Sequence, residues 1–156
     1  MSLLEPRPVV FTAQSKLHYY CRDAVCEFVF RHGAIPINPF RAFGYFLDDR
    51  VERDLVRQAN NNLLRRADAL WVFGAEIADG VLFEVRYARE LGKAIRYFTI
   101  DSHAETIRPL DPQELRFEAE VHEATGLTRE QLLASIHGEP PTSAESASSR
   151  PRLTET

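Results

Sequence analysis

Short apolar runs alternate with longer amphipathic stretches along this chain, and this alternation constrains the fold more than any other feature. Three runs rich in β-branched and aromatic residues have the pattern of buried strands: Pro8–Ala13, Ala69–Phe73 and Ala94–Ile100. Strands that alternate with helices are joined by right-handed crossovers and lie parallel in one sheet. We therefore expect an α/β fold, a three-layer sandwich around a mostly parallel, Rossmann-like (flavodoxin-like) sheet.

The stretches between these strands carry start and stop signals. Ser15 can cap a helix, and Gly33 can end it. Pro36 cannot donate to a strand ladder, so the run Ala34–Ile37 is expected at the edge of the sheet or at the end of a strand. The apolar stripe expected on the first helix is Leu17, Tyr20, Cys21, Ala24, Val25, Phe28 and Val29.

The rest of the chain is assigned more coarsely. We expect a turn at Asn38–Phe40 and then a helix at Asp49–Arg66, with Val51, Leu55, Ala59 and Leu63 at successive turns. A loop at Gly74–Gly80 and a helix at Val81–Leu91 are expected next. Two weaker helices are expected at Pro112–Ala124 and Thr128–Ile136. The second weak helix opens on a capping box, Thr128 with Gln131. The segment Arg41–Leu47 is aromatic and irregular and receives no assignment.

Length and composition indicate one domain at residues 1–138 and a tail at 139–156. The chain has 156 residues, an ordinary size for a single domain. After Gly138 the sequence is rich in Pro, Ser, Ala and Thr and lacks the apolar content to fold, so we expect this tail to be disordered.

Charge and apolar patterning exclude several classes of partner. The chain has 19 Lys and Arg against 23 Asp and Glu, so no basic surface for a nucleic acid polymer is expected. No apolar run approaches the ~20 residues of a membrane span, and no signal peptide is visible at the start, so we expect a cytoplasmic protein. Cys21 and Cys26 lack metal or disulfide spacing and the histidines form no ligand pattern, so neither a metal nor another cofactor is expected.

Candidate ligand-binding residues follow from the expected sheet. Ligands of open α/β sheets bind beyond the carboxyl ends of the strands. This rule selects the segments Thr12–Lys16, Asn38–Phe40, Gly74–Glu84 and Thr99–Ser102. The candidate binding residues within and beside them are Thr12, Ala13, Gln14, Ser15, Lys16, Asn38, Phe40, Asn60, Gly74, Gly80 and Val81.

Glu84 is the strongest candidate for a chemically active side chain. It falls in the first or second turn of its helix, where the helix dipole stabilises an anion, and its apolar neighbours predict partial burial. Gly80 lets the backbone approach a ligand closely. The plain structural alternative is that Asp79 and Glu84 only decorate a helix start, as acidic residues commonly do.

At these residues the sequence resembles a known superfamily. The run Gly80-Val81-x-Phe83-Glu84-x-x-x-Ala88, followed by Gly92-Lys93 and preceded by Ala67-Asp68, looks like the signature of nucleoside 2-deoxyribosyltransferases. That superfamily includes 2′-deoxynucleoside 5′-phosphate N-hydrolases and cytidylate N-glycosidases. Riboside-monophosphate phosphoribohydrolases use a related arrangement, so the motif implies an N-glycosidic class more firmly than a substrate.

The resemblance implies roles for individual residues. Glu84 would be the catalytic nucleophile that attacks the anomeric carbon of a (deoxy)nucleoside or nucleotide, and Asp79 would assist protonation of the leaving base. It also implies a homodimer or larger assembly. Independent support comes from the aromatic segment Phe40–Phe46 and from Leu47, Val56 and Leu64, which we expect to meet a partner subunit. The alternative is that the aromatic segment forms a lid over its own site.

Two departures from the superfamily pattern leave the function open. No glycine occurs in Thr12–Lys16, where members usually have Gly-Pro or Gly-Ser, although Ser15 and Lys16 can hold a phosphate or serve merely as cap and solvated lysine. Asn60 replaces the acidic residue that often positions the ribose hydroxyls, and an amide cannot act as an anion. The sequence thus allows an N-glycosidic enzyme, a non-catalytic nucleotide-binding or sensor module of the same fold, or a scaffold whose tail recruits a partner.

Overall fold

The computed structural model describes residues 2–137. The expected tail at 139–156, and the boundary placed before it, lie outside the described residues. Within the described part, no helix is both long and apolar enough to cross a membrane.

A parallel four-stranded sheet forms the centre of the fold, in the order β2-β1-β3-β5. Its strands are β2 Ile35–Ile37, β1 Val9–Gln14, β3 Ala69–Phe73 and β5 Ala94–Phe98. β2 lies at the edge, as Pro36 predicts. The chain therefore has the expected α/β, Rossmann-like architecture. From β1 the chain runs outward to β2 and then crosses back to β3 on the other side of β1, so the strand order reverses between β1 and β3, where ligands of such folds bind.

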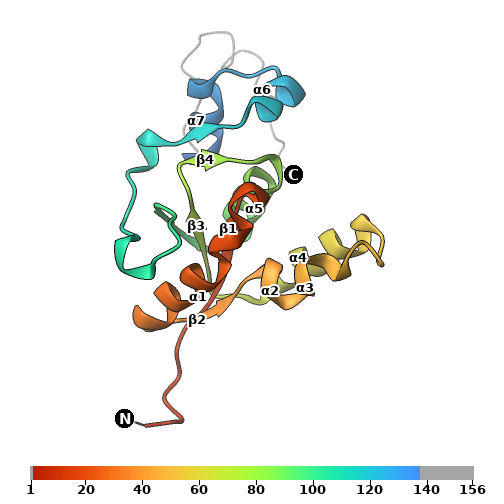
Figure 1. The fold of residues 1–156 in the computed structure, drawn as a ribbon. Helices are drawn as coiled ribbons and strands as arrows, with labels where there is room; N and C mark the ends of the chain where they lie inside the picture. The colour runs from red at the N-terminus through yellow and green to blue at the C-terminus, as the bar shows by residue number, and fades with distance from the viewer. Residues whose placement is uncertain (1, 138–156) are drawn as a thin grey trace, which may run out of the picture.

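Helices cover both faces of the sheet and give the molecule its three layers (Figure 1). On one face, α1 Arg22–Arg31 packs Phe28 against Trp71, Phe73 and Phe98 of β3 and β5. On the other face, α4 Arg53–Arg66, α5 Asp79–Glu90 and α7 Arg129–His137 form a second core with β1 and β3. Because successive strand residues point to opposite faces, both cores draw on the same strands.

A second, two-stranded parallel sheet lies beyond the first and was not expected. It pairs β4 Glu76–Ile77 with β6 Arg116–Phe117. The expected loop at Gly74–Gly80 therefore contains a strand. The expected helix at Pro112–Ala124 is divided into a 3₁₀ turn η3 Pro112–Glu114, β6, and α6 Ala119–Thr125. Two-residue strands carry no periodicity, so only their tertiary pairing reveals them.

The first expected helix is correct in extent but not in its buried face. Ser15 caps a 3₁₀ helix, η1 Lys16–Cys21, before α1 begins, and a second 3₁₀ turn, η2 Ala104–Thr106, lies against α1. The backbone kinks at His18, and this kink turns Leu17 and Tyr20 outward, so that 62% and 61% of their surfaces are exposed. The stripe is buried only from Cys21 onward.

The segment that received no assignment is helical in short pieces. Asn38 caps α2 Pro39–Ala42 instead of forming a plain turn, and α3 Gly44–Leu47 follows. Residues Tyr45 to Asp49 all have positive φ. This left-handed run makes up most of α3 and continues to Asp49, so the expected right-handed helix at Asp49–Arg66 begins only at Arg53.

The buried face of α4 also differs from expectation. Leu55 is 53% exposed, whereas Leu64 is completely buried in the core beside α5. The expectation that Leu64 meets a partner subunit is therefore wrong. At the end of the described chain, the Thr128 capping box is confirmed, because the Gln131 N–H donates to Thr128 Oγ1 over 3.2 Å and the Thr128 N–H donates to Gln131 Oε1 over 2.9 Å.

Candidate functional site

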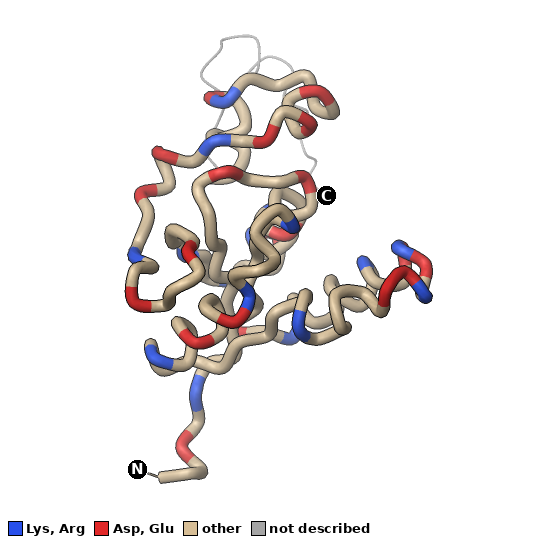
Figure 2. The backbone as a smooth tube through the Cα atoms, in the orientation of Figure 1, with Lys and Arg blue, Asp and Glu red and all other residues tan. Residues whose placement is uncertain are grey.

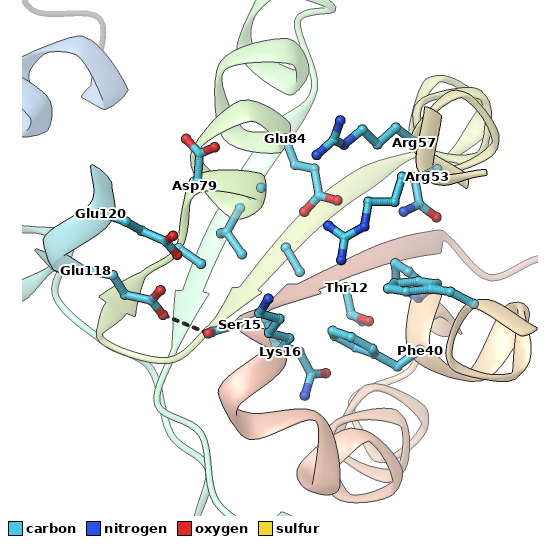
Figure 3. Close-up of a pocket in the computed structure, with 18 residues that line it drawn as sticks. Thr12, Ser15, Lys16, Phe40, Arg53, Arg57, Asp79, Glu84, Glu118 and Glu120 are labelled. Atoms are coloured by element: carbon cyan, nitrogen blue, oxygen red, sulfur yellow. Dashed lines mark hydrogen bonds between the residues drawn. The ribbon is translucent and has the colours of Figure 1, made fainter. Parts of the chain in front are cut away.

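A cavity of about 310 Å³ opens at the carboxyl end of β1 and the start of α5. η1, α2, α4 and the β6–α6 junction complete its walls (Figure 3). The predicted residues that line it are Thr12, Ala13, Gln14, Ser15, Lys16, Phe40, Asn60, Asp79, Gly80, Val81 and Glu84. Pro39 and Ala78 also line it and fall within the segments selected from the sequence, and Phe46 belongs to the aromatic segment considered as a lid. The lining residues that sequence reasoning missed are Arg53, Arg57, Glu118 and Glu120.

Two predicted residues lie outside this cavity. Gly74 ends β3 with a φ of +110°, and a Cβ there would lie 3.5 Å from Ile100, on another side of the strand end. Asn38 is buried behind the cavity wall, where its amide donates to Thr12 Oγ1 and Gln14 Oε1, each over 2.9 Å. Asn38 therefore fixes the end of β1 from behind and does not line the cavity.

Glu84 occupies the second turn of α5 and points into the cavity (Figure 3). Burial raises the pKa of its carboxyl group from 4.5 to about 8. In the described part of the chain no ion pair or hydrogen bond satisfies this side chain, although Arg53 and Arg57 extend toward it from α4. With a pKa of about 8, this carboxyl group is mainly protonated at neutral pH.

Arg53, Arg57 and Asn60 form one wall of the cavity. They occur at i, i+4 and i+7 in α4 and therefore share one helix face. Asn60 Oδ1 is buried and has no hydrogen-bond partner within residues 2–137. The helical spacing was available from the sequence, but the two arginines could not be assigned to a site before the position of α4 was known.

Acidic side chains form the opposite wall. Asp79 lies at the start of α5, and Glu118 and Glu120 lie at the β6–α6 junction (Figure 3). Ser15 Oγ donates a hydrogen bond to Glu118 Oε2 over 2.7 Å and accepts one from the N–H of Leu17. No local pattern marks Glu118 and Glu120, because only the small second sheet brings them to this edge.

Apolar and open surfaces complete the cavity. Pro39, Phe40 and Phe46 provide an apolar floor from α2 and α3. A Cβ built at Gly80 would meet no atom within 4 Å, so the backbone at the start of α5 faces open space. A ligand can therefore lie across Glu84, with an aromatic surface beneath it and charged groups of opposite sign at its two ends.

Comparison with known families places most of this site in one sequence family. Residues 11–98 match a family described as a domain of unknown function (DUF7768). The chain belongs to this family. The match covers β1 from Phe11 onward, the other three strands of the main sheet and the cavity residues up to Glu84, while Glu118 and Glu120 lie beyond it. No curated protein matches the chain.

Proposed function

We propose that this protein is an N-glycosidic enzyme that cleaves or transfers the base of a (deoxy)nucleoside or nucleoside monophosphate, with Glu84 as nucleophile. The observation that carries the proposal is the position of Glu84, a carboxyl group set into a cavity at the carboxyl ends of parallel strands. The resemblance of the surrounding motif to nucleoside 2-deoxyribosyltransferases supports it.

The reaction follows from the groups around the cavity. Ionised Glu84 attacks the anomeric carbon as the C–N bond to the base breaks, which gives a covalent glycosyl-enzyme ester. The bond's electron pair leaves with the base, which takes up a proton, and Asp79 is the carboxyl group we assign to supply it. Water or a second base then displaces Glu84 from the sugar.

The burial of Glu84 affects both its protonation and its reactivity. The raised pKa means that Glu84 must lose its proton before it attacks. Once ionised, a carboxylate of high basicity and little solvation is a stronger nucleophile than an exposed glutamate.

Base release is the direct test. The protein is incubated with (deoxy)nucleosides and their monophosphates, and free base is measured by chromatography. Glu84→Gln and Glu84→Ala are expected to reduce release by about 10³-fold or more, as removal of a nucleophile does. Glu90→Gln, on the same helix but outside the cavity, is the matched control and is expected to keep full activity. Activity within a few-fold of wild type in both Glu84 variants would contradict the proposal.

A nucleotide-binding module is the second candidate. Asn60 in place of an acidic residue, together with a protonated Glu84, favours a site that binds without turning over. Tight binding of a nucleotide to the wild-type chain, with no base released from any member of the panel, would establish this alternative.

A further inference from the structure

The cavity is divided by charge. Arg53 and Arg57 on α4 form its cationic wall, and Asp79, Glu118 and Glu120 form its acidic wall, while Lys16 of η1 lies beside Ser15 at the end of β1. Glu84 lies between the two walls (Figure 3). Figure 2 shows acidic residues at α6. In α4 the basic residues Arg53, Arg57, Arg65 and Arg66 outnumber the one acidic residue, Asp54. A ligand that spans the cavity therefore meets opposite charges at its two ends.

Lys16 is the one cation that the segment after β1 adds to the cavity lining, and Ser15 beside it is poorly suited to bind an anion. The Ser15 hydroxyl is already occupied, since it donates to Glu118 and accepts from the Leu17 N–H. The Glu118 carboxylate beside it would repel a phosphate. This end of the cavity therefore favours hydrogen-bond donors of the ligand.

The α4 wall has the opposite character. Within the described residues, Arg53 forms no ion pair or hydrogen bond, and Arg57 pairs only with the exposed Asp54 over 3.2 Å. Guanidinium groups present several donors in a planar fork that matches the oxygens of a phosphate. Asn60, one turn further along the same face, leaves a buried Oδ1 able to accept a hydrogen bond from a sugar hydroxyl.

We propose that the cavity takes a nucleoside 5′-monophosphate with an amino-bearing base, its phosphate at Arg53 and Arg57 and its base at the acidic wall. The proposal rests on the proposed function for the class of ligand. In this orientation the sugar lies over Glu84 and its hydroxyls face Asn60. An exocyclic amino group donates to Glu118 or Glu120, whereas a carbonyl oxygen at the same position would face a carboxylate.

Calorimetric binding to the Glu84→Gln chain tests both ends without turnover. Cytidine 5′-monophosphate is compared with cytidine, which lacks the phosphate, and with uridine 5′-monophosphate, which replaces the amino group by oxygen. We expect loss of the phosphate to weaken binding about 10- to 100-fold. Replacement of the amino group is expected to weaken it about tenfold.

Charge-removing variants in the same background locate each end. Arg53→Gln and Arg57→Gln are each expected to weaken binding of cytidine 5′-monophosphate about tenfold and to leave the affinity for cytidine unchanged. Glu120→Gln is expected to reduce the preference for the amino-bearing base. Arg66→Gln on α4 and Glu123→Gln on α6 remove the same charges outside the cavity and serve as matched controls.

The outcomes separate this proposal from the proposed function. Equal affinity for cytidine and its monophosphate, or arginine variants that behave like Arg66→Gln, would overturn the phosphate assignment even if the wild-type chain releases base. Equal affinity for the cytosine and uracil nucleotides would overturn the assignment of the base. The expected binding pattern in a chain that releases no base would uphold the orientation and contradict the enzymatic function.

Discussion

The pKa of the Glu84 carboxyl group depends both on its position in the helix and on its tertiary environment. Its place in the second turn of α5 favours the ionised carboxylate, whereas burial favours the protonated form. The pKa of about 8 shows that burial dominates. The helix dipole contributes at most about 1 kcal/mol at ordinary sites, and desolvation of a carboxylate costs more than that.

The raised pKa of Glu84 makes stability depend on pH. Between pH 4.5 and about 8, Glu84 is ionised in the unfolded chain but holds its proton in the folded one, so stability falls as pH rises. The slope from this one proton is at most about 1.4 kcal/mol per pH unit. Glu84→Gln removes this dependence.

Thermal unfolding of both chains across this pH range measures the effect. We expect the melting temperature of Glu84→Gln, minus that of wild type, to increase as pH rises from 5 to 8, because only the wild type has the carboxyl group with a pKa of about 8. A constant difference between the two chains over the range would contradict the raised pKa. Because the measurement needs no substrate, its result does not depend on the proposed function.

At the scale of elements, the left-handed run from Tyr45 to Asp49 is the least expected feature. Positive φ costs an L-residue about 1–2 kcal/mol, and none of these positions is a glycine. Aromatic packing holds the run in place: Tyr45 stacks on Tyr19 with ring centroids 4.8 Å apart, and Phe46 lies 5.5 Å from Phe40. Tertiary contacts between rings thus impose a backbone that local preference disfavours.

Glycine substitution tests this strain. Leu47 has a φ of +57° and is exposed, so Leu47→Gly is expected to leave stability unchanged or to raise it by up to about 1 kcal/mol. Leu55→Gly, at a similarly exposed position inside α4, is the matched control and is expected to lose about 1 kcal/mol. Denaturant unfolding compares the two, and equal losses would show that the run is unstrained.

At the scale of the whole molecule, the aromatic segment Phe40–Phe46 was expected either to meet a partner subunit or to form a lid over its own site. Phe40 and Phe46 line the cavity of their own chain, as a lid would. Exposed apolar side chains also occur on α4 and α5, where Leu55 is 53% and Phe83 is 55% exposed. These helices lie side by side, and the Arg65 guanidinium of α4 donates a hydrogen bond to the Tyr87 hydroxyl of α5 over 3.2 Å.

We predict a homodimer or larger assembly that buries this α4–α5 surface. Large apolar side chains exposed on two neighbouring helices suit an interface between subunits, and twofold homodimers are the commonest assembly. Light scattering at micromolar concentration should give a multiple of 17.8 kDa. Phe83→Glu should shift the mass toward one subunit, while Phe30→Glu, an equally exposed position on α1, should not. A wild-type mass near 17.8 kDa would contradict the prediction.

The sequence by itself determined the elements whose signals are local. The strands β1, β3 and β5, the edge position of Pro36, the cap at Ser15 and the capping box at Thr128 all follow from residues within a few positions of one another. The strand-and-helix alternation then fixed the parallel sheet, and the rule for its carboxyl edge selected most of the cavity lining, Glu84 included.

Only the tertiary structure decided what meets across the cavity. Glu118 accepts a hydrogen bond from Ser15, which is 103 positions away in the sequence. The pairing of β4 with β6 places it there, and strands of two residues show no periodicity in the sequence. Arg53 and Arg57 enter the site because α4 packs beside α5, so that their common helix face lines the cavity. The charge division of the cavity and the protonation of Glu84 both arise from groups distant in sequence. Electrostatic interaction and desolvation depend on distance in space, and local sequence patterns do not encode that distance.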